Sequence, residues 1–166
     1  NEETSIAKYT RALQGFLQIE PNSKKLKPYV QYRIGKMFCY GLGTEQDYEK
    51  AFEWFERSAK QKNKFAQFSL ANLYYYGSGV EKDLSQAFLW YQRSSSQGQP
   101  YAAYSIAQMY RYGEYVTKDN DTAQRYYKQA LSGFLKIESD DMANDDLFYK
   151  LGQMFKFGLG TDSDVT

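Results

Sequence analysis

The chain contains no histidine among its 166 residues and only one cysteine, Cys39. Without histidine it cannot form a Ser–His or Cys–His catalytic pair, and it lacks the commonest general base and transition-metal ligand. A single cysteine cannot close an internal disulfide, which favours a reduced, cytoplasmic setting. These absences predict a protein that is not an enzyme and that holds no metal or cofactor.

The chain also has no excess of charge of one sign and no long hydrophobic run. Lys plus Arg number 21 and Asp plus Glu number 20, which gives a formal net charge of +1 at pH 7. Proteins that bind duplex DNA or a membrane surface usually carry a basic stripe, so this balance is evidence against such partners. No apolar run approaches the roughly 18 residues that cross a bilayer, and no signal-peptide pattern opens the chain. We therefore expect no membrane partner.

What the sequence does contain is an internal repeat with a step of 36 residues. The columns that keep this step are Gly41/Gly77/Gly113, Asp47/Asp83/Asp119, Ala51/Ala87/Ala123 and Trp54/Trp90/Tyr126. Because so many columns share one spacing, the fold is expected to be a stack of similar supersecondary units.

Each repeat has the pattern of two amphipathic helices joined by a glycine-containing turn. Residues 66–76 carry apolar side chains at i, i+4, i+7 and i+8, which is one stripe of a helix. Gly77 and Gly79 follow, and glycine accepts the positive φ at which helices often end. Asp83 then occupies the expected N-cap of a second helix. An all-α chain of helical hairpins is therefore predicted.

The same reading along the chain gives the remaining helices and the repeat boundaries. The predicted helices are 4–20, 29–40, 48–61, 65–76, 84–97, 101–112, 120–138 and 145–157. Residues 4–20 align without a gap with 122–138, so the first helix resembles the second helix of a hairpin. The expected units of this single repeat domain are a half repeat 4–28, repeats 29–64, 65–100 and 101–144, and a half repeat 145–166.

The motif Gly-x-Gly-Val-x-x-Asp-x-x-x-Ala-x-x-Trp-Tyr at 77–91, preceded by Leu-Ala-x-Leu-Tyr-x-Tyr, resembles the Sel1-like repeat, a relative of the tetratricopeptide repeat. The resemblance covers nearly the whole chain. It implies a right-handed α-solenoid, an α-α superhelix that holds proteins together, usually without chemistry of its own. The third repeat departs from the pattern because Tyr115 replaces the second glycine, so we expect that turn to differ.

Both ends of the chain divide a repeat. Residues 158–164 repeat the pattern of 41–47, which places Asp164 at the N-cap position of a further helix. We interpret the chain as a fragment of a longer solenoid. The alternative is that the exposed end faces pack on a second copy in end-to-end self-association.

By analogy with the tetratricopeptide repeat, the resemblance implies a concave surface formed by the first helix of each repeat. The residues expected to bind a partner there are Tyr32, Lys36, Cys39, Phe68, Asn72, Tyr75, Tyr104, Gln108, Arg111, Tyr149, Gln153 and Lys156. A further aromatic border is expected at Tyr40, Tyr76, Tyr112 and Phe157. Tyrosines mixed with amides and cations suit a peptide, because rings supply apolar area and the polar groups bond an extended backbone. The alternative reading is that the aromatics fill space between helices, as expected for Tyr74, Tyr110 and Phe155.

Three functions follow from these observations. The first is a non-catalytic protein-interaction scaffold that binds a peptide or partner domain on its concave face. The second is an accessory region of a larger bacterial enzyme. Its basis is that Gly-Phe-Leu-x-Ile-Glu followed by Asp-Asp-Leu-x-Tyr-x-Leu-Gly-x-Met is similar to segments attached to plasmid-mobilisation relaxases of Gram-positive bacteria.

A less favoured partner is single-stranded nucleic acid. Tyrosine with arginine suits stacking on its bases, but the charge balance disfavours it. The third is a hydrolase, for which the sequence offers no constellation, since capping explains the spaced aspartates.

Overall fold

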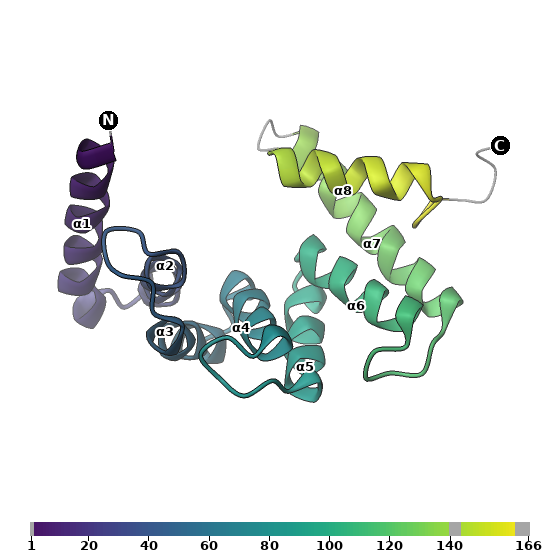
Figure 1. The fold of residues 1–166 in the computed structure, drawn as a ribbon, viewed down its shortest axis with the longest axis horizontal. Coiled ribbons are helices and arrows are strands. Elements are labelled where there is room, and N and C mark those ends of the chain that lie inside the picture. Colours follow the sequence, from purple (N-terminus) through teal and green to yellow (C-terminus); the bar gives the residue numbers. More distant parts are fainter. Residues whose placement is uncertain (1, 140–143, 162–166) are drawn as a thin grey trace. The chain divides into compact units, whose positions relative to one another are not determined.

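A computed structural model of the protein describes residues 2–139 and 144–161 (Figure 1). The described residues are helical throughout, with no strand among them. The elements are α1 (Glu2–Ile19), the 3-10 turn η1 (Glu20–Asn22), α2 (Lys27–Tyr40), α3 (Tyr48–Lys60), α4 (Lys64–Tyr76), α5 (Leu84–Ser96), α6 (Pro100–Tyr112), α7 (Asn120–Ser139) and α8 (Asp145–Lys156). The prediction of an all-α fold is confirmed, and the helix ends agree within about two residues.

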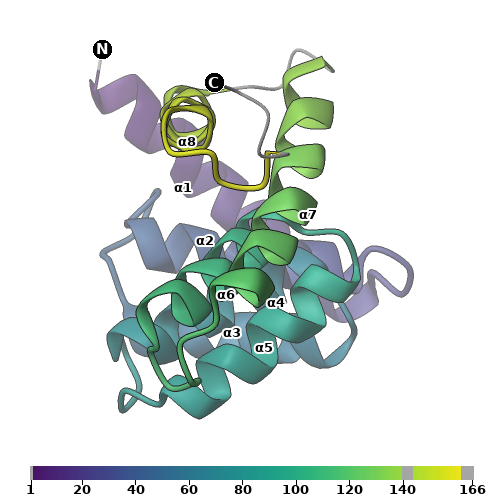
Figure 2. The ribbon, with the colours of Figure 1, turned by 90° about the vertical axis from the view of Figure 1, so that its right-hand side faces the viewer.

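The chain divides into two compact units, Asn1–Trp90 and Tyr91–Thr166, with the boundary inside α5. In the first unit α2 packs against both α1 and α3, and α3 packs against α4. In the second unit α7 packs against both α6 and α8, and Figure 2 looks almost along α8 with α7 beside it. Each unit is thus built from helices that pack on their neighbours in the sequence, as expected for a helical repeat.

The turns between paired helices follow the predicted chemistry. The first helices α2, α4 and α6 end at Gly41, Gly77 and Gly113, whose φ angles are 65°, 71° and 73°. Each of these glycines donates its N–H to a carbonyl four residues earlier, which satisfies one of the free carbonyls at the helix end. The glycine column of the repeat is therefore a column of helix C-caps.

The aspartate column supplies the N-caps of the second helices, as predicted. Oδ1 of Asp83 accepts the backbone N–H groups of Ser85 and Gln86 at 2.9 and 3.0 Å and the Ser85 hydroxyl at 2.6 Å. Asp47 and Asp119 make the equivalent bonds to Lys50 and Thr122. The side-chain hydrogen bond from Lys50, Ser85 or Thr122 is the main cause that lowers the pKa of each carboxyl. These acids stabilise helix starts and need no catalytic explanation.

The turn of the third repeat corrects one expectation. Tyr115 adopts a φ of 65°, close to the values of 73° and 69° at Gly43 and Gly79, so this turn keeps the same backbone as the others. Its hydrogen bond from Glu114 N to Met109 O also matches the bond from Ser78 N to Leu73 O. The prediction that the turn differs is wrong, because tyrosine accepts the left-handed conformation here at a conformational cost.

The second glycine of the turns lies directly on a neighbouring helix. A Cβ at Gly79 would lie 2.3 Å from the backbone carbon of Tyr48, at the start of α3. A Cβ at Gly43 would lie equally close to Tyr9, and one at Gly160 would lie 2.4 Å from Tyr127. Since such distances are far below van der Waals contact, only glycine permits this backbone-to-backbone packing. The turn of one repeat therefore rests on the second helix of the repeat before it.

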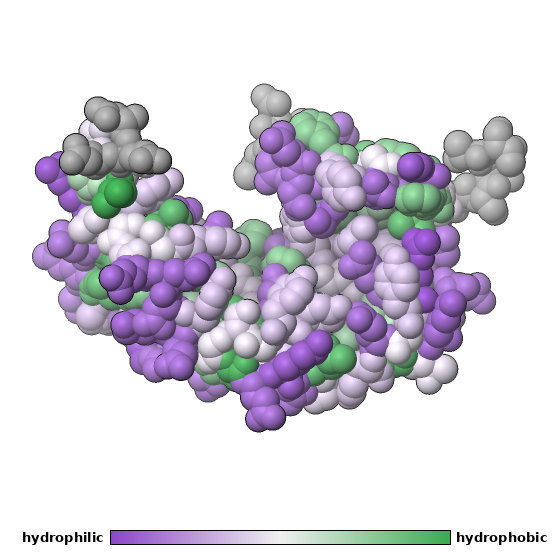
Figure 3. All heavy atoms as spheres, in the orientation of Figure 1, coloured by the Kyte–Doolittle hydropathy of each residue, from purple (hydrophilic) through white to green (hydrophobic). Residues whose placement is uncertain are grey.

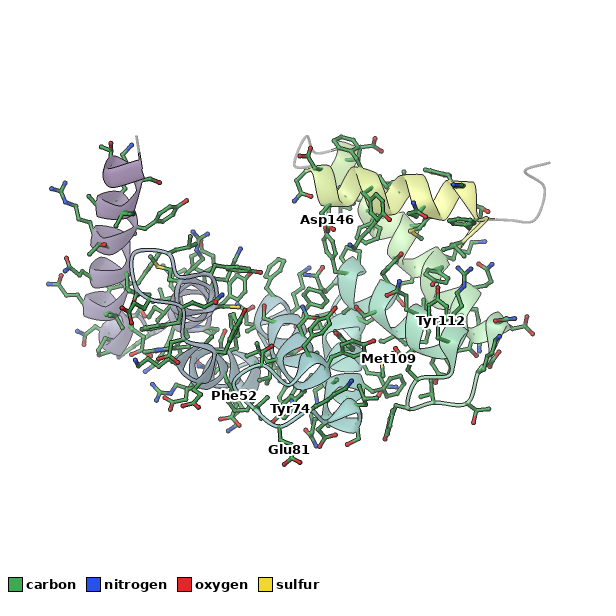
Figure 4. The ribbon with its side chains drawn as sticks, viewed as in Figure 1. Phe52, Tyr74, Glu81, Met109, Tyr112 and Asp146 are labelled. Carbon is green, nitrogen blue, oxygen red and sulfur yellow. The ribbon has the colours of Figure 1, made fainter. Side chains whose placement is uncertain are left out.

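Aromatic pairs complete the packing between first and second helices. The rings of Phe52 and Tyr74 meet edge-on with centroids 5.4 Å apart (Figure 4), and those of Tyr110 and Tyr126 stack at 6.0 Å. These contacts confirm the packing role predicted for Tyr74 and Tyr110. The same prediction is wrong for Phe155, whose side chain is 54% exposed because no described second helix covers that side of α8.

Candidate partner-binding surface

The residues predicted to bind a partner lie on the first helices, in two sets. In the first unit α2 and α4 carry Tyr32, Lys36, Cys39, Phe68, Asn72 and Tyr75. In the second unit α6 and α8 carry Tyr104, Gln108, Arg111, Tyr149, Gln153 and Lys156. Each unit therefore holds its own set.

Two of the predicted tyrosines pack at the edge of a core. The ring centroid of Tyr32 lies 6.0 Å from that of Phe55 and 5.8 Å from that of Phe65, and burial raises the pKa of Tyr32 to about 12. The ring centroid of Tyr104 lies 5.4 Å from that of Tyr127, and burial raises its pKa as well. Both rings connect helices, so only part of each is available to a ligand.

Cys39 is half-buried and carries a free thiol. Burial raises the pKa of this thiol, and the nearby charge of Lys36 opposes the shift only in part. Because the thiolate is the nucleophilic form, a raised pKa leaves the side chain mostly protonated and unreactive at neutral pH. Burial thus disfavours the nucleophilic form of Cys39, and its place in a binding surface stays a prediction.

Four exposed aromatics lie at the C-terminal ends of the first helices, two of them in each unit. The exposed fractions are 63% for Tyr40, 71% for Tyr76, 64% for Tyr112 and 54% for Phe157. Each ring stands immediately before a left-handed glycine, where the helix stops and the chain turns away. Figure 4 shows Tyr112 at this end of α6, beyond Met109. Their exposure leaves a large apolar side chain in water at the same point of every repeat.

At each of these helix ends a cation lies near an aromatic ring. Nζ of Lys36 is 5.6 Å from the ring centroid of Tyr40, and Cζ of Arg111 is 5.7 Å from that of Tyr112. Nζ of Lys156 is 5.2 Å from the centroid of Phe157. The second repeat obtains its cation from the turn, since Nζ of Lys82 lies 5.7 Å from the ring of Tyr75, which meets Tyr76 edge-on. Each unit thus carries such groups at two helix ends, and we call them the cation–aromatic edge of that unit.

The lysines of this edge differ from other lysines in their partners. In the described part of the chain, Lys36, Lys82 and Lys156 form no ion pair with a carboxylate. By contrast, Lys50 and Lys150 lie 2.8 and 2.7 Å from the carboxylates of Asp47 and Asp146. The edge therefore presents positive charge that the protein itself does not neutralise, next to exposed rings.

Two amides of the predicted row are also available. Gln108 and Gln153 are half-buried, and neither side chain makes a hydrogen bond to another described residue. An amide offers both donors and an acceptor, so these side chains can bond a peptide backbone. In the second unit, the two amides that the sequence predicted to bind a partner, Gln108 and Gln153, therefore have donors and acceptors that remain unused.

A hollow that the sequence did not indicate lies in the second unit. It has a volume of about 430 Å³ and is lined by Tyr110, Thr122, Arg125, Tyr126 and Gln129. Its polar groups are already paired, because Arg125 donates to the Thr122 hydroxyl at 2.7 Å and Gln129 donates to the Ser95 carbonyl at 2.9 Å. The hollow therefore has little free polar capacity with which to bind a ligand.

The described residues contain no group of three or more Cys, Asp and Glu side chains placed to hold a metal ion. Over the same residues every buried side-chain nitrogen or oxygen has a hydrogen-bond partner. None of the helices in residues 2–139 and 144–161 is long and apolar enough to span a bilayer. Among described residues, the cation–aromatic edge is the surface whose chemistry repeats from one first helix to the next.

Comparison with known proteins identifies the repeat. The family model described as the Sel1 repeat matches residues 28–63, 64–99, 100–133 and 149–166. No curated protein sequence matches the chain.

Two solved structures share the fold. The crystal structure of a Sel1 repeat protein from Oxalobacter formigenes is similar over 99% of this chain, with a TM-score of 0.71 and 24% identity. The crystal structure of c5321, a protective antigen present in uropathogenic Escherichia coli strains that displays an SLR fold, is similar over 92% of this chain, with a TM-score of 0.69 and 26% identity. The matched regions span 65% and 30% of those two chains.

Proposed function

Because the chain belongs to the Sel1 repeat family, we propose that it is a non-catalytic scaffold that binds a peptide or partner domain along the first helices of its repeats. Sel1 repeats commonly mediate protein–protein interactions, and proteins that carry them are generally not enzymes. The observation that carries the proposal for this chain is the cation–aromatic edge. At each of the helix ends that carry Tyr40, Tyr76, Tyr112 and Phe157, a cation lies near an aromatic ring.

The chemistry of the edge favours a peptide with both acidic and apolar side chains. An exposed tyrosine buries a large area on binding while it loses few rotamers, which is why tyrosine and arginine are common at interface hot spots. A carboxylate of the ligand would pair with Lys36 or Lys156, which have no acidic partner in the described chain. The amides of Gln108 and Gln153 would bond its backbone.

Panning a random-peptide display library against the chain tests the proposal. We expect enriched peptides to combine Asp or Glu with apolar residues, and to bind more weakly as salt rises because the cations are exposed. Fluorescence anisotropy with a labelled enriched peptide then gives the Kd. In the double variant Tyr40→Ala/Tyr76→Ala we expect binding to weaken at least tenfold, since each lost hot-spot ring costs about 1–2 kcal/mol.

The matched control is Tyr48→Ala, which removes a tyrosine that is 38% exposed on the second helix α3. Its Kd should stay within about twofold of the unmodified chain. Failure of the library to enrich any sequence, or equal losses in the control and the double variant, would reject the edge as the binding surface.

Attachment to a larger enzyme, such as a relaxase, stays a prediction of the sequence motif alone. A single-stranded nucleic-acid ligand is a competing outcome of the same experiments. It would bind with a steep salt dependence from phosphate contacts and would not require an acidic peptide.

A further inference from the structure

Acidic residues are distributed unevenly between the two kinds of helix in the repeat. The first helices α2, α4 and α6 contain no Asp or Glu, whereas the second helix α3 contains Glu49, Glu53 and Glu56. On α3 the carboxylates of Glu53 and Glu56 lie 3.5 and 2.9 Å from Arg57 and Lys60. Because salt screens exposed charges beyond about 10 Å, a ligand responds to the charges near its own site. The balance of 21 cations against 20 acids over the whole chain therefore does not describe the surface of the first helices.

The helix α2 carries a stripe of two cations between two aromatic rings, which we call the α2 stripe. Its residues fall at i, i+4, i+7 and i+11, on one side of the helix, and are Tyr29, Arg33, Lys36 and Tyr40. The two rings are 47% and 63% exposed, Arg33 is exposed and Lys36 is half-buried. Neither cation forms an ion pair with a described carboxylate, and residues 21–44 contain no Asp or Glu. The protein itself therefore leaves the charge of this stripe unneutralised.

The two cations of the α2 stripe lie beside different rings. Cζ of Arg33 is 5.9 Å from the ring centroid of Tyr29, and Nη1 donates to the Tyr29 hydroxyl at 3.4 Å. Nζ of Lys36 is 5.6 Å from the ring centroid of Tyr40, at the other end of the helix. In the space-filling view, hydrophobic atoms reach the visible surface of the first unit only in small separate areas (Figure 3). The stripe therefore offers two positions at which a negative group meets both a cation and a ring.

The exposure of this stripe belongs to its position in the repeat. On α4, which follows α2 in the same unit, the counterparts of Tyr29 and Tyr40 are Phe65 and Tyr76. These rings are 43% and 71% exposed, although Tyr32 of α2 packs against Phe65 with ring centroids 5.8 Å apart. The same side of a first helix is thus open where another first helix precedes it.

The two cations distinguish α2 from the next two first helices. At the four positions of the stripe, α4 carries Phe65, Ser69, Asn72 and Tyr76, and α6 carries Tyr101, Ser105, Gln108 and Tyr112. The aromatic ends recur, but a hydroxyl and an amide replace Arg33 and Lys36. Of these three helices, α2 is therefore the one whose stripe suits negative groups.

We propose that the α2 stripe selects a peptide segment with two acidic residues about three positions apart. One carboxylate pairs with Arg33 beside Tyr29, and the other pairs with Lys36 beside Tyr40. The midpoints of these two ring and cation pairs are about seven residues apart on α2, or about 10 Å at a rise of roughly 1.5 Å per residue. An extended peptide covers about 10 Å in about three residues. This inference rests on the proposed peptide-binding function and adds the chemistry of the segment that the first unit binds.

The neighbouring helix favours a peptide over single-stranded nucleic acid. A nucleic acid carries a phosphate at every nucleotide and needs a cationic groove along its whole path. At the positions of Arg33 and Lys36, α4 presents Ser69 and Asn72, which are neutral. Two carboxylates on a peptide match the local extent of the charge on α2.

Peptides that differ only in charge test the selection. The probes are a labelled peptide enriched from the random library by the chain Asn1–Thr166, and a version with Asn and Gln in place of its Asp and Glu. We expect enriched peptides to carry two acids about three positions apart, and the amide version to bind about tenfold more weakly by fluorescence anisotropy. Each exposed ion pair contributes a factor of roughly two to five, so two pairs account for this loss.

The variant Arg33→Ser/Lys36→Gln gives α2 the polar residues that α6 carries at these positions, so we expect an unchanged circular dichroism spectrum. It should bind the acidic peptide about tenfold more weakly, and the amide version as tightly as the unmodified chain does. The matched control is Arg57→Ser/Lys60→Gln, which removes an arginine and a lysine at the same spacing from α3, where carboxylates neutralise them. It should bind both peptides within about twofold of the unmodified chain.

The outcomes separate this inference from the function on which it rests. If the amide version binds as tightly as the acidic peptide, or Arg33→Ser/Lys36→Gln loses no more affinity than the control, selection by the α2 stripe is overturned while peptide binding stands. If no peptide is enriched, both are overturned. If a labelled oligo(dT) binds more tightly than the acidic peptide and loses affinity in Arg33→Ser/Lys36→Gln, the stripe recognises phosphates and the peptide is the wrong ligand.

Discussion

At the scale of single residues, the backbone conformations that favour glycine are not always occupied by glycine. Lys62 follows the end of α3 with a φ of 66°, and Gly98 occupies the equivalent position after α5 with a φ of 75°. Both donate their N–H to a carbonyl three residues earlier at 2.9 Å. The two positions therefore have the same geometry, but only one of them avoids the cost of a left-handed side chain.

We expect Lys62→Gly to stabilise the protein by about 0.5–1 kcal/mol, because relief of the left-handed strain exceeds the entropy that glycine adds to the unfolded chain. Urea unfolding measures the change. Lys62→Ala removes the same side chain but keeps the strain, so it should change stability by less than about 0.5 kcal/mol. If Lys62→Gly and Lys62→Ala changed the free energy of unfolding equally, the effect would come from loss of the side chain and not from relief of the backbone strain.

A second residue-scale prediction concerns alkaline pH. Burial raises the pKa of Tyr127 to about 12, although its hydrogen bond with Arg111 acts in the opposite direction. The folded state therefore keeps the phenol neutral where the unfolded state, with a pKa near 10, releases its proton. This contribution to stability is constant below about pH 10 and is lost as the pH rises from about 10 to 12.

Replacing this phenol should remove part of that pH dependence. In Tyr127→Phe we expect the loss of stability between pH 9 and 11.5 to be smaller than in the unmodified chain, by up to about 2 kcal/mol. Urea unfolding at a series of pH values measures how the free energy of unfolding falls with pH in each protein. The variant also loses the Arg111 bond, so it should start from a lower stability at pH 8. Parallel curves for the two proteins would mean that Tyr127 does not titrate in this way.

At the scale of the helices, the decisive contact is the turn glycine on a neighbouring helix. We expect Gly79→Ala to destabilise the protein by about 3–5 kcal/mol, because its Cβ would meet the Tyr48 backbone at 2.3 Å and its φ is positive. Gly98→Ala is the control, since it has a positive φ but no neighbour within 4 Å. That control should cost only about 1–2 kcal/mol. A difference near zero between the two variants would contradict the packing role of the turn.

The helices themselves were predictable from the sequence, but this contact was not. The apolar stripes, the glycine C-caps and the aspartate N-caps are local features, so the pattern locates every described helix to within about two residues. The repeated second glycine indicated a turn and nothing more, because a close backbone approach depends on where the next repeat packs. The prediction that the third turn differs failed because it considered only the residue type of Tyr115. The backbone hydrogen bonds of the turn hold this residue in the left-handed conformation that glycine adopts in the other turns.

At the scale of the whole molecule, the family and the all-α fold followed from the repeat, whereas the roles of individual aromatics did not. Tyr32 and Tyr104 were predicted to contact a partner, but much of each ring packs against a second helix. A sequence column cannot show which rings are covered. Tyr40, Tyr76 and Tyr112 were predicted only at the border of the site, yet they are as exposed as Tyr149, which was predicted within it. All the partner-binding residues, those of the edge included, stay predictions.

The most direct test of the proposed scaffold is hydroxyl-radical footprinting with and without an enriched library peptide, because radical labelling reports the exposure of each tyrosine side chain. We expect the peptide to protect rings of the edge, Tyr40 and Tyr76 or Tyr112 and Phe157, and to leave Tyr48 on α3 labelled as before. Protection confined to second helices, with labelling of the edge unchanged, would contradict partner binding along the first helices.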